Sequence, residues 1–119
     1  MTAARPAKTS TCLDLSERLE RVRRYLHDHL DRGVTLDELA SVALLSPFHL
    51  ARWFKRAFGQ APIAYHRALR LAHAAERLGQ SRSLAAAAEA AGYSDQAALC
   101  HAFRRHFGCA PRQWVARSS

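Results

Sequence analysis

The chain has 119 residues, of which 49% are apolar and 24% are charged, and its formal net charge is +8. This length suits one compact domain, or two very small ones that share a helix. No apolar run approaches the roughly 20 residues that a membrane span needs, and the first twelve residues lack the apolar stretch of a secretory signal. We therefore expect a cytoplasmic protein without a membrane partner.

The cysteines and the charge distribution narrow the class further. Cys12, Cys100 and Cys109 form no C-x-x-C pair, so we expect reduced thiols rather than a disulfide framework or a zinc ribbon. Residues 46–82 contain seven basic side chains and one acidic one, whereas residues 1–33 contain seven basic and five acidic ones. A basic surface attracts phosphate backbones and anionic membranes alike, so charge alone does not identify the partner.

The first predicted element is a long helix. It follows residues 1–14, a polar segment with Ala and Pro that we expect to be flexible. Asp14 and Glu17 form a capping box, which predicts that the helix begins there, and Gly33 is its predicted stop. Apolar residues recur along it at helical spacing: Leu19, Val22, Tyr25, Leu26 and Leu30.

Two shorter helices follow. Thr35 and Glu38 form a second capping box and predict a short helix that ends at Leu44. Ser46 is the predicted cap of the next helix, with Pro47 at its first position, where the missing N–H costs nothing. The residues of the short helix that we expect to face inward are Leu36, Leu39, Ala40 and Ala43.

The second half of the chain repeats this arrangement after a connecting helix. Gly59 ends the third helix after Phe58, Pro62 begins the connecting helix, which reaches about Leu78, and a polar break follows at residues 79–83. The residues along one side of the connecting helix are Tyr65, Leu69, Ala72, Ala75 and Leu78. The remaining predicted elements are a helix over 84–91 capped by Ser83, a helix over 96–107 opened by Ser94 and Asp95, and a final turn over 111–115.

The two halves are copies of one motif. A shift of 48 residues places identical residues on one another: Leu36 on Leu84, Ala40 on Ala88, Ala43 on Ala91 and Ser46 on Ser94. A shift of 49 does the same for Leu50 and Leu99, Phe54 and Phe103, Phe58 and Phe107, Gly59 and Gly108, Ala61 and Ala110, and Pro62 and Pro111, and it places Tyr65 on Trp114. A unit of this size, used twice, predicts two helix-turn-helix motifs.

The residues of this repeat also carry a family resemblance. They are Leu36, Ser46, Arg52, Phe54, Gly59, Pro62, Tyr65, Arg70, Leu71, Leu78, Gly92, Tyr93, Asp95, Phe103, Phe107, Gly108 and Pro111. Their spacing resembles that of the DNA-binding domain of AraC-type bacterial transcription regulators, over roughly residues 17–116. The resemblance implies an all-α fold of seven helices: two helix-turn-helix subdomains, residues 15–61 and 80–119, joined by a long linker helix over 62–79.

The resemblance also implies the function. Each second helix of a motif would enter the major groove of double-stranded DNA, and adjacent major-groove segments on one face lie about 34 Å, or about 10 base pairs, apart. It favours an activator that contacts RNA polymerase and binds DNA as a monomer. The initiator-like Met1 favours a stand-alone regulator of the short type over a DNA-binding fragment of a longer protein.

The first reading helix would be residues 47–58. Its buried stripe would be Leu50, Phe54 and Phe58, with Trp53 partly buried, and the resemblance places base-reading positions at Phe48, Ala51 and Arg52, with His49 also facing outward. An arginine fork can bond guanine O6 and N7 together, and a phenylalanine can contact a thymine methyl group. The plainer alternatives are that Arg52 is a solvated surface charge and that Phe48 packs on its own helix.

The second reading helix is poorer in hydrogen-bonding groups. Its outward residues are Gln96, Ala97, Ala98, Cys100 and His101, where family members often place Ser or Thr and an Arg. Gln96 can pair with adenine, and the alanines can contact thymine methyl groups. We expect the first copy to specify sequence and the second to hold register, unless Gln96 is simply a residue that starts its helix.

Phosphate contacts are expected from basic side chains and from capped helix starts. The residues are Ser46, Lys55, Arg56, Arg67, Arg70, Ser94, Arg104 and Arg105. If about six such contacts form, affinity falls roughly as the fifth power of salt concentration. Each of these arginines is equally typical of a solvated surface, and Arg70 has the further alternative of bonding helix ends inside the domain.

Other functions are less favoured. The sequence has no nucleophile elbow, phosphate-binding glycine loop or HExxH motif, so we expect no enzyme activity and no cofactor. Cys100, His101, His106 and Cys109 cluster in sequence, but His101 and His106 point about 140° apart on a helix, so we expect no metal site. An alkyl-acceptor role for Cys12 is disfavoured because no partner cysteines lie near it. An all-helical protein-binding adaptor without DNA binding remains the main alternative.

Overall fold

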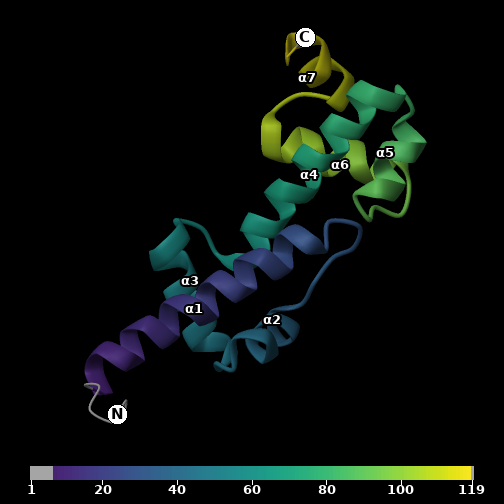
Figure 1. Cartoon of the computed structure of the whole chain (residues 1–119). Helices are drawn as coiled ribbons and strands as arrows, with labels where there is room; N and C mark the ends of the chain where they lie inside the picture. Colours follow the sequence, from purple (N-terminus) through teal and green to yellow (C-terminus); the bar gives the residue numbers. More distant parts are fainter. Residues whose placement is uncertain (1–6, 119) are drawn as a thin grey trace. The chain divides into compact units, whose positions relative to one another are not determined.

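The computed structural model describes the backbone of residues 7–118 and the side chains of residues 14–117. This part of the chain is folded into seven helices and contains no strand, which confirms the predicted all-α class (Figure 1). The helices are α1 (Ala7–Asp28), α2 (Leu36–Ala43), α3 (Pro47–Phe58), α4 (Pro62–Ser81), α5 (Leu84–Ala90), α6 (Gln96–Phe107) and α7 (Pro111–Ser118).

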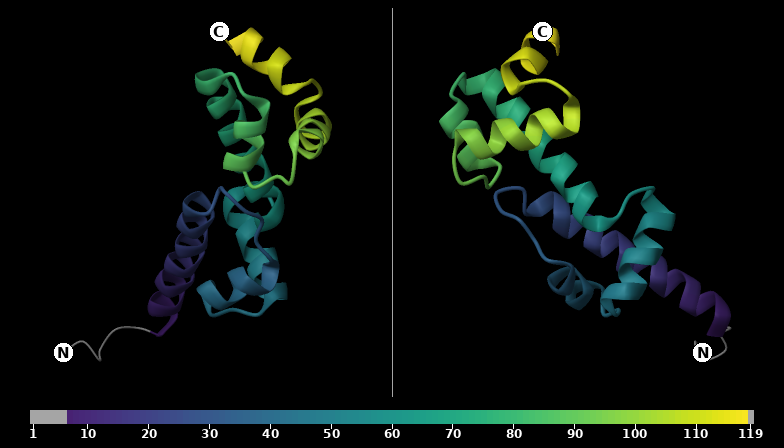
Figure 2. Two further views of the ribbon diagram at one scale, coloured as in Figure 1. Left: turned by 90° about the vertical axis from the view of Figure 1, so that its right-hand side faces the viewer. Right: turned by 180° about the vertical axis from the view of Figure 1, so that it is seen from behind.

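The chain divides into two units. Unit 1 contains α1, α2 and α3, and unit 2 contains the loop 29–33, α4 from Ile63 onward, and α5 to α7. In unit 1, α1 packs against both α2 and α3, and α2 packs against α3 (Figure 2). Each helix contributes one apolar stripe to the core of this unit, because residues three and four positions apart share a helix face. The stripes consist of Leu19, Val22 and Leu26; Leu39, Ala40 and Ala43; and Leu50 and Phe54.

Local capping fixes the start of α2. Thr35 Oγ1 accepts a hydrogen bond from the Glu38 amide at 3.1 Å, and Glu38 Oε1 accepts one from the Thr35 amide at 3.4 Å. The predicted capping box is therefore confirmed. The hydroxyl of Tyr25 donates to the other carboxylate oxygen of Glu38, which ties α1 to the start of α2.

The first helix begins earlier than the sequence predicts. α1 starts at Ala7, and Asp14 lies inside it, where its carboxylate pairs with Arg18 at 2.8 Å. The predicted capping box of Asp14 and Glu17 is therefore wrong. No glycine or proline separates Ala7 from Asp14, so nothing in the sequence interrupts the helix there. Residues 1–6 of the segment that we expected to be flexible lie outside the described residues.

The same helix also ends earlier than predicted. α1 stops at Asp28, so Leu30 and Gly33 lie in the loop that follows and not in the helix. The carbonyl oxygen of His29 accepts a hydrogen bond from Nε2 of the buried His66 at 2.6 Å. A side chain distant in sequence thus holds the backbone where the helix ends, which no local pattern indicates.

Unit 2 has its own core. Leu71, Ala74, Ala75 and Leu78 of α4 pack with small residues of α5 and with two large residues of α6. Phe107 of α6 and Trp114 of α7 pack against this core. The centroids of their rings lie 4.4 Å apart. The residues contributed by α5 and α6, with the residue after α5, are Ala87, Ala88, Ala91, Leu99 and Phe103.

Helices α4 and α7 differ from the predictions in three respects. Ala72, which we expected on the inward side of α4, is exposed, because the buried stripe runs through Leu71 and Ala74 instead. α4 also continues through Gly79 to Ser81 and ends at Arg82, which has a left-handed φ of 63°. α7 extends past the predicted turn over 111–115 to Ser118.

The internal repeat includes α1 and α4, which the sequence comparison missed. A shift of 52 residues places the buried residues of α1 on buried residues of α4: Leu19 on Leu71, Val22 on Ala74 and Leu26 on Leu78. The same shift places Arg18 on Arg70. Each unit is therefore one scaffold helix that carries one helix-turn-helix motif.

Candidate nucleic-acid interface

The first predicted reading helix, α3, has the bounds that the sequence indicates. Ser46 Oγ accepts a hydrogen bond from the His49 amide at 3.1 Å, Pro47 occupies the first turn, and Gly59 ends the helix at φ 85°. Ser46 Oγ also lies 2.7 Å from Nδ1 of His49, so the imidazole is held against the helix start. This leaves Nε2 as the ring nitrogen not used by the cap.

The two faces of α3 differ sharply. Leu50 and Phe54 are completely buried in unit 1, whereas Phe48 is 69% exposed. Arg52 is also exposed, and Ala51, which we expected to face outward, is half-buried. The ring of Phe48 lies 5.6 Å from that of His49 between centroids, and most of it faces solvent, so it is accessible to a partner. The exposed face thus presents one aromatic ring and one guanidinium group within a single turn.

The end of α3 is basic. Lys55 and Arg56 are exposed, and the Arg56 guanidinium lies over the ring of Trp53, 5.2 Å from its centroid. Trp53 is half-buried, as the sequence indicated. Stacking on an indole orients a guanidinium while leaving its N–H groups free for an anion. Arg56 is therefore a preorganised cation at the rim of this face.

The second predicted reading helix, α6, begins with a different cap. The N-cap is Asp95, whose carboxylate accepts a hydrogen bond from the Ala98 amide at 2.8 Å. Ser94, the predicted phosphate contact, is exposed just before it. Both caps occupy one backbone amide, but the carboxylate of Asp95 is negatively charged and repels a phosphate, whereas the hydroxyl of Ser46 is neutral. The N-terminus of α6 is thus less suited to phosphate than that of α3.

The buried and exposed faces of α6 follow the prediction only in part, because Phe107, expected in the buried stripe, is half-buried. Leu99 and Phe103 are completely buried. Of the five proposed base-reading residues, Gln96, Ala97 and His101 are exposed, while Ala98 and Cys100 are half-buried. Only Gln96 and His101 among them carry strong hydrogen-bonding side chains. The exposed face of α6 is therefore much poorer in donors and acceptors than a sequence-specific helix usually is.

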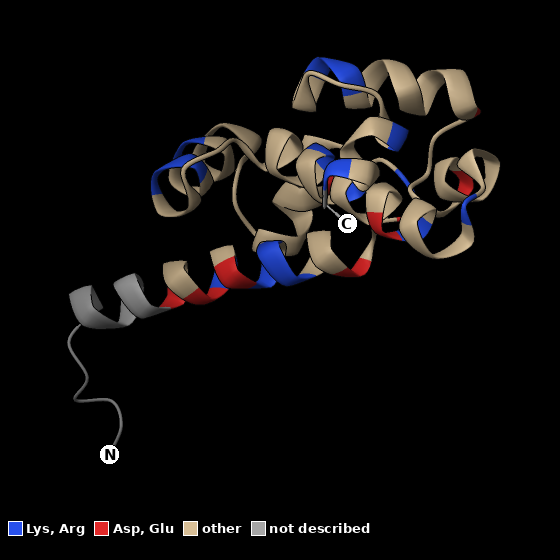
Figure 3. Ribbon diagram, turned by 90° about the horizontal axis from the view of Figure 1, so that it is seen from above, with Lys and Arg blue, Asp and Glu red and all other residues tan. Residues whose placement is uncertain are grey.

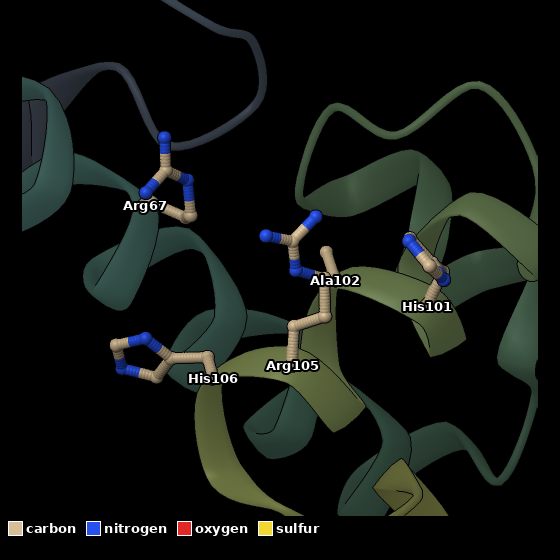
Figure 4. A pocket seen from close by; sticks show the side chains of 5 residues that line it. All are labelled: Arg67, His101, Ala102, Arg105 and His106. Carbon is tan, nitrogen blue, oxygen red and sulfur yellow. The ribbon is translucent and has the colours of Figure 1, made fainter.

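Positive charge lies on both helices. Neither α3 nor α6 contains an acidic residue, whereas acidic and basic segments alternate along α1 (Figure 3). Arg67 on α4 and Arg104 and Arg105 on α6 are exposed. Arg67 and Arg105 line one cavity with His101, Ala102 and His106 (Figure 4).

Arg70 is held inside unit 2. Its Nε donates to the carbonyl oxygen of Ala91 and its Nη2 to that of Gly92, both at 2.9 Å, and its guanidinium lies 4.5 Å from the ring centroid of Tyr93. These contacts match the alternative in which Arg70 bonds helix ends within the domain, and its contact with phosphate stays a prediction. Burial raises the pKa of Tyr93, and the neighbouring Arg70 charge opposes that rise.

Sequence reasoning missed the equivalent residue of unit 1. Arg18 Nη1 donates to the carbonyl oxygen of Leu44 at 3.1 Å, at the turn between α2 and α3. The 52-residue shift that relates Arg18 to Arg70 is the sequence signal for this contact. The sequence also gave no indication that His106 and Ala102 share a cavity with Arg67.

The cysteines and histidines that cluster in the sequence around α6 differ in burial and surroundings. Cys109 is 6% exposed and lies 4.0 Å from Nη1 of Arg117, and Cys100 is half-buried. Within the described residues, no group of three or more His, Cys, Asp or Glu side chains is suited to hold a metal ion. The side chain of Cys12 lies outside the described residues. No described helix combines the length and the apolar character that crossing a bilayer requires.

Comparisons with known proteins agree with this geometry. A family described as a helix-turn-helix domain matches residues 39–117. A putative AraC-like transcription regulator of Streptomyces antibioticus is 39% identical over 88 residues, which is 73% of this chain and 29% of that protein. The chain spans about a third of the length of the curated relatives that it matches.

Solved structures are similar over most of the chain. The C-terminal domain of AraT, a response regulator from Geobacillus stearothermophilus, is 30% identical with a TM-score of 0.78, and 87% of each chain is covered. The DNA-binding domain of the transcriptional factor AdpA, solved with a target DNA, is 27% identical with a TM-score of 0.72, covering 84% of this chain and 91% of that one. This chain belongs to the AraC-type family of helix-turn-helix DNA-binding domains.

Proposed function

We propose that this chain is a sequence-specific double-stranded DNA-binding transcription regulator that inserts α3 and α6 into successive major-groove segments. The observation that carries the proposal is the repeated construction of these two helices. Each is capped at its start, ended by a glycine, buried along one stripe and exposed along an acid-free face. An exposed face without carboxylates can approach a phosphate-lined groove without charge repulsion.

In this proposal the two helices contribute unequally. Arg52 bonds a guanine, and Phe48, 69% exposed, contacts a thymine methyl group in the same half of the site. Gln96 is the main hydrogen-bonding residue of α6, supported by the apolar contact of Ala97. Sequence specificity is therefore concentrated under α3, and α6 mainly fixes the register of the protein on the duplex.

Phosphate contacts supply most of the affinity. Lys55 and Arg56 act at the end of α3, Arg104 and Arg105 at the equivalent end of α6, and the amides behind Ser46 at the start of α3. The similarity to the AdpA domain, whose structure includes a target DNA, supports DNA as the partner. At the level of the whole regulator, we propose activation through RNA polymerase and binding of DNA as a monomer.

A gel shift with random-sequence duplex at several salt concentrations tests the proposal. We expect binding at low salt that weakens steeply as salt rises, roughly as the fifth power if about six phosphate contacts form. A protein-binding adaptor would give no shift even at low ionic strength, and that result would overturn the proposal. A charge-matched control is Arg77→Ala, on the exposed surface of α4 and outside the proposed contacts, which should change the slope little.

A further inference from the structure

Unit 2 contains a cavity lined by basic side chains. Its volume is about 380 Å³, and its lining residues are Arg67 of α4 and His101, Ala102, Arg105 and His106 of α6. Figure 4 shows the guanidinium groups of Arg67 and Arg105, which come from the two helices, on either side of the same space. None of the five lining residues is acidic, so the cavity offers two permanent cations and two imidazoles without an internal counter-charge.

The repeat explains why the cavity exists. The 49-residue shift places Trp53 on Ala102 and Arg56 on Arg105, so a methyl group stands in unit 2 where unit 1 has an indole. In unit 1 the Arg56 guanidinium lies over that indole at 5.2 Å. Without the ring, the space beside α6 is open and Arg105 has no aromatic platform.

The scaffold helices α1 and α4 also differ at the position that lines the cavity. The 52-residue shift that superimposes α1 on α4 places the apolar Leu15 on Arg67. Thus a leucine and a tryptophan of unit 1 correspond to an arginine and an alanine at the cavity of unit 2. Within the described part of the chain, Arg67 and Arg105 form no hydrogen bond or ion pair.

We propose that this cavity binds one phosphate group of the DNA backbone next to α6. The inference rests on the proposed function. Two guanidinium groups that approach from different helices can bond the non-bridging oxygens of one phosphate, and arginine forks suit this geometry. His101 and His106 also line the cavity and add imidazole N–H donors. His101 then contacts the backbone and not a base, which leaves Gln96 as the only strongly polar base-reading residue of α6.

The experiment uses duplexes that carry a single neutral methylphosphonate, placed at each backbone position of a selected site in turn. We expect one position under α6 at which the neutral group weakens binding of the unchanged protein. Arg67→Ala and Arg105→Ala should weaken binding to the unmodified duplex and lower the salt slope by about 1 each. They should also abolish the effect of that one methylphosphonate, because the phosphate no longer has its partner.

Two further variants sharpen the test. Ala102→Trp restores the residue of unit 1, fills the cavity and should have the same effect as the arginine variants. Arg77→Ala removes an exposed charge from α4 outside the cavity and should retain full sensitivity to the methylphosphonate. Because Arg67 and Arg105 are exposed, their variants are expected to fold even if the tryptophan variant does not.

The outcomes separate the two proposals. If the unchanged protein binds no duplex at all, the proposed function fails. If it binds, but the Arg67 and Arg105 variants keep the full methylphosphonate effect at every position, the cavity is not a DNA phosphate site and this inference is wrong. A thermal stabilisation by inorganic phosphate that needs both arginines, without any coupling to a methylphosphonate, would assign the cavity to a free anion and would also overturn the inference.

Discussion

Arg18 Nη1 lies 3.1 Å from the carbonyl oxygen of Leu44, and this contact ties α1 to the turn between α2 and α3. Arg70 makes the corresponding contact in unit 2, with Gly92 and also with Ala91. Leu44 and Gly92 are related by the 48-residue shift, and the two arginines by the 52-residue shift. The duplication has therefore preserved a guanidinium that holds each helix-turn-helix turn on its scaffold helix.

Arg70→Ala should lower the free energy of unfolding of the chain by about 2 kcal/mol, because two carbonyl oxygens lose charged donors. Arg70→Lys should recover part of this, since an ammonium group can reach only one carbonyl at a time. Urea denaturation followed by circular dichroism gives both values. Arg77→Ala on the same helix is the control, and an equal loss in Arg70→Ala and Arg77→Ala would show that the carbonyl contacts contribute nothing.

The turn of unit 1 is strained at Leu44. This residue has φ 57°, a left-handed conformation that a side chain disfavours, and it is 69% exposed, so little packing offsets the strain. Leu44→Gly should raise the free energy of unfolding by about 1 kcal/mol. The matched change in unit 2, Gly92→Ala, should be strongly destabilising, because the added Cβ would lie 2.6 Å from the backbone of Arg32.

Urea titrations of both variants check this pair of predictions. The two effects should have opposite signs although the positions are equivalent in the repeat. A Leu44→Gly variant that is less stable than the unchanged chain would mean that the exposed leucine makes contacts of its own. A neutral Gly92→Ala variant would mean that the loop 29–33 yields to the added methyl group.

The helices of the two motifs could be predicted because their signals are local. Each signal lies within one turn of the helix end that it determines. The signals are the Thr35 and Glu38 pair, Ser46 with Pro47, and the glycine after α3. Two of the wrong predictions, the end of α1 and the inward side of α4, have distant causes. The backbone at His29 is held by the His66 side chain, and the inward side of α4 is decided by which residues the core of unit 2 accepts, so Ala72 is exposed and Leu71 is buried.

In the candidate site, too, the features with local signals could be predicted and those that depend on distant packing could not. The sequence indicated the exposed face of α3, since its buried stripe of Leu50 and Phe54 leaves Phe48 and Arg52 on the other side. The cavity beside α6 could not be predicted in this way. It depends on the packing of α4 against α6, which brings Arg67 to the same cavity as Ala102 and Arg105 although these residues lie far apart in the sequence.

Protonation of His66 should destabilise unit 2. The side chain is 2% exposed and donates from Nε2 to the His29 carbonyl. Burial lowers the pKa of His66, against a smaller opposing effect of that hydrogen bond, and the charges of Arg70 and Arg32 lower it further. The unfolded chain binds the proton more readily than the folded chain. The stability that neutral His66 contributes is therefore complete above about pH 6.5 and is lost as pH falls through the lowered pKa.

The measurement is the free energy of unfolding between pH 8 and pH 5 for the unchanged chain and for His66→Gln. Glutamine keeps a donor for the His29 carbonyl but does not titrate. The variant should therefore lose less stability over this range than the unchanged chain. Identical slopes would show that other groups account for the acid sensitivity.

The two reading helices should differ in how much specificity they carry. Arg52→Ala should reduce discrimination at one base pair by about 1–3 kcal/mol, whereas Gln96→Ala should reduce it by less than this at any position. Binding constants for a site mutated base by base give both values. Equal information under both halves of the site would refute the asymmetry.

Selection of bound sites from a pool of random duplexes tests the central claim most directly. Two reading helices of unequal specificity should select an asymmetric site whose two segments lie about 10 base pairs apart. The segment with the stronger sequence preference should lose that preference in Arg52→Ala. A selected palindrome, a single uninterrupted segment, or no enrichment at all would contradict a monomer that places α3 and α6 in successive major-groove segments.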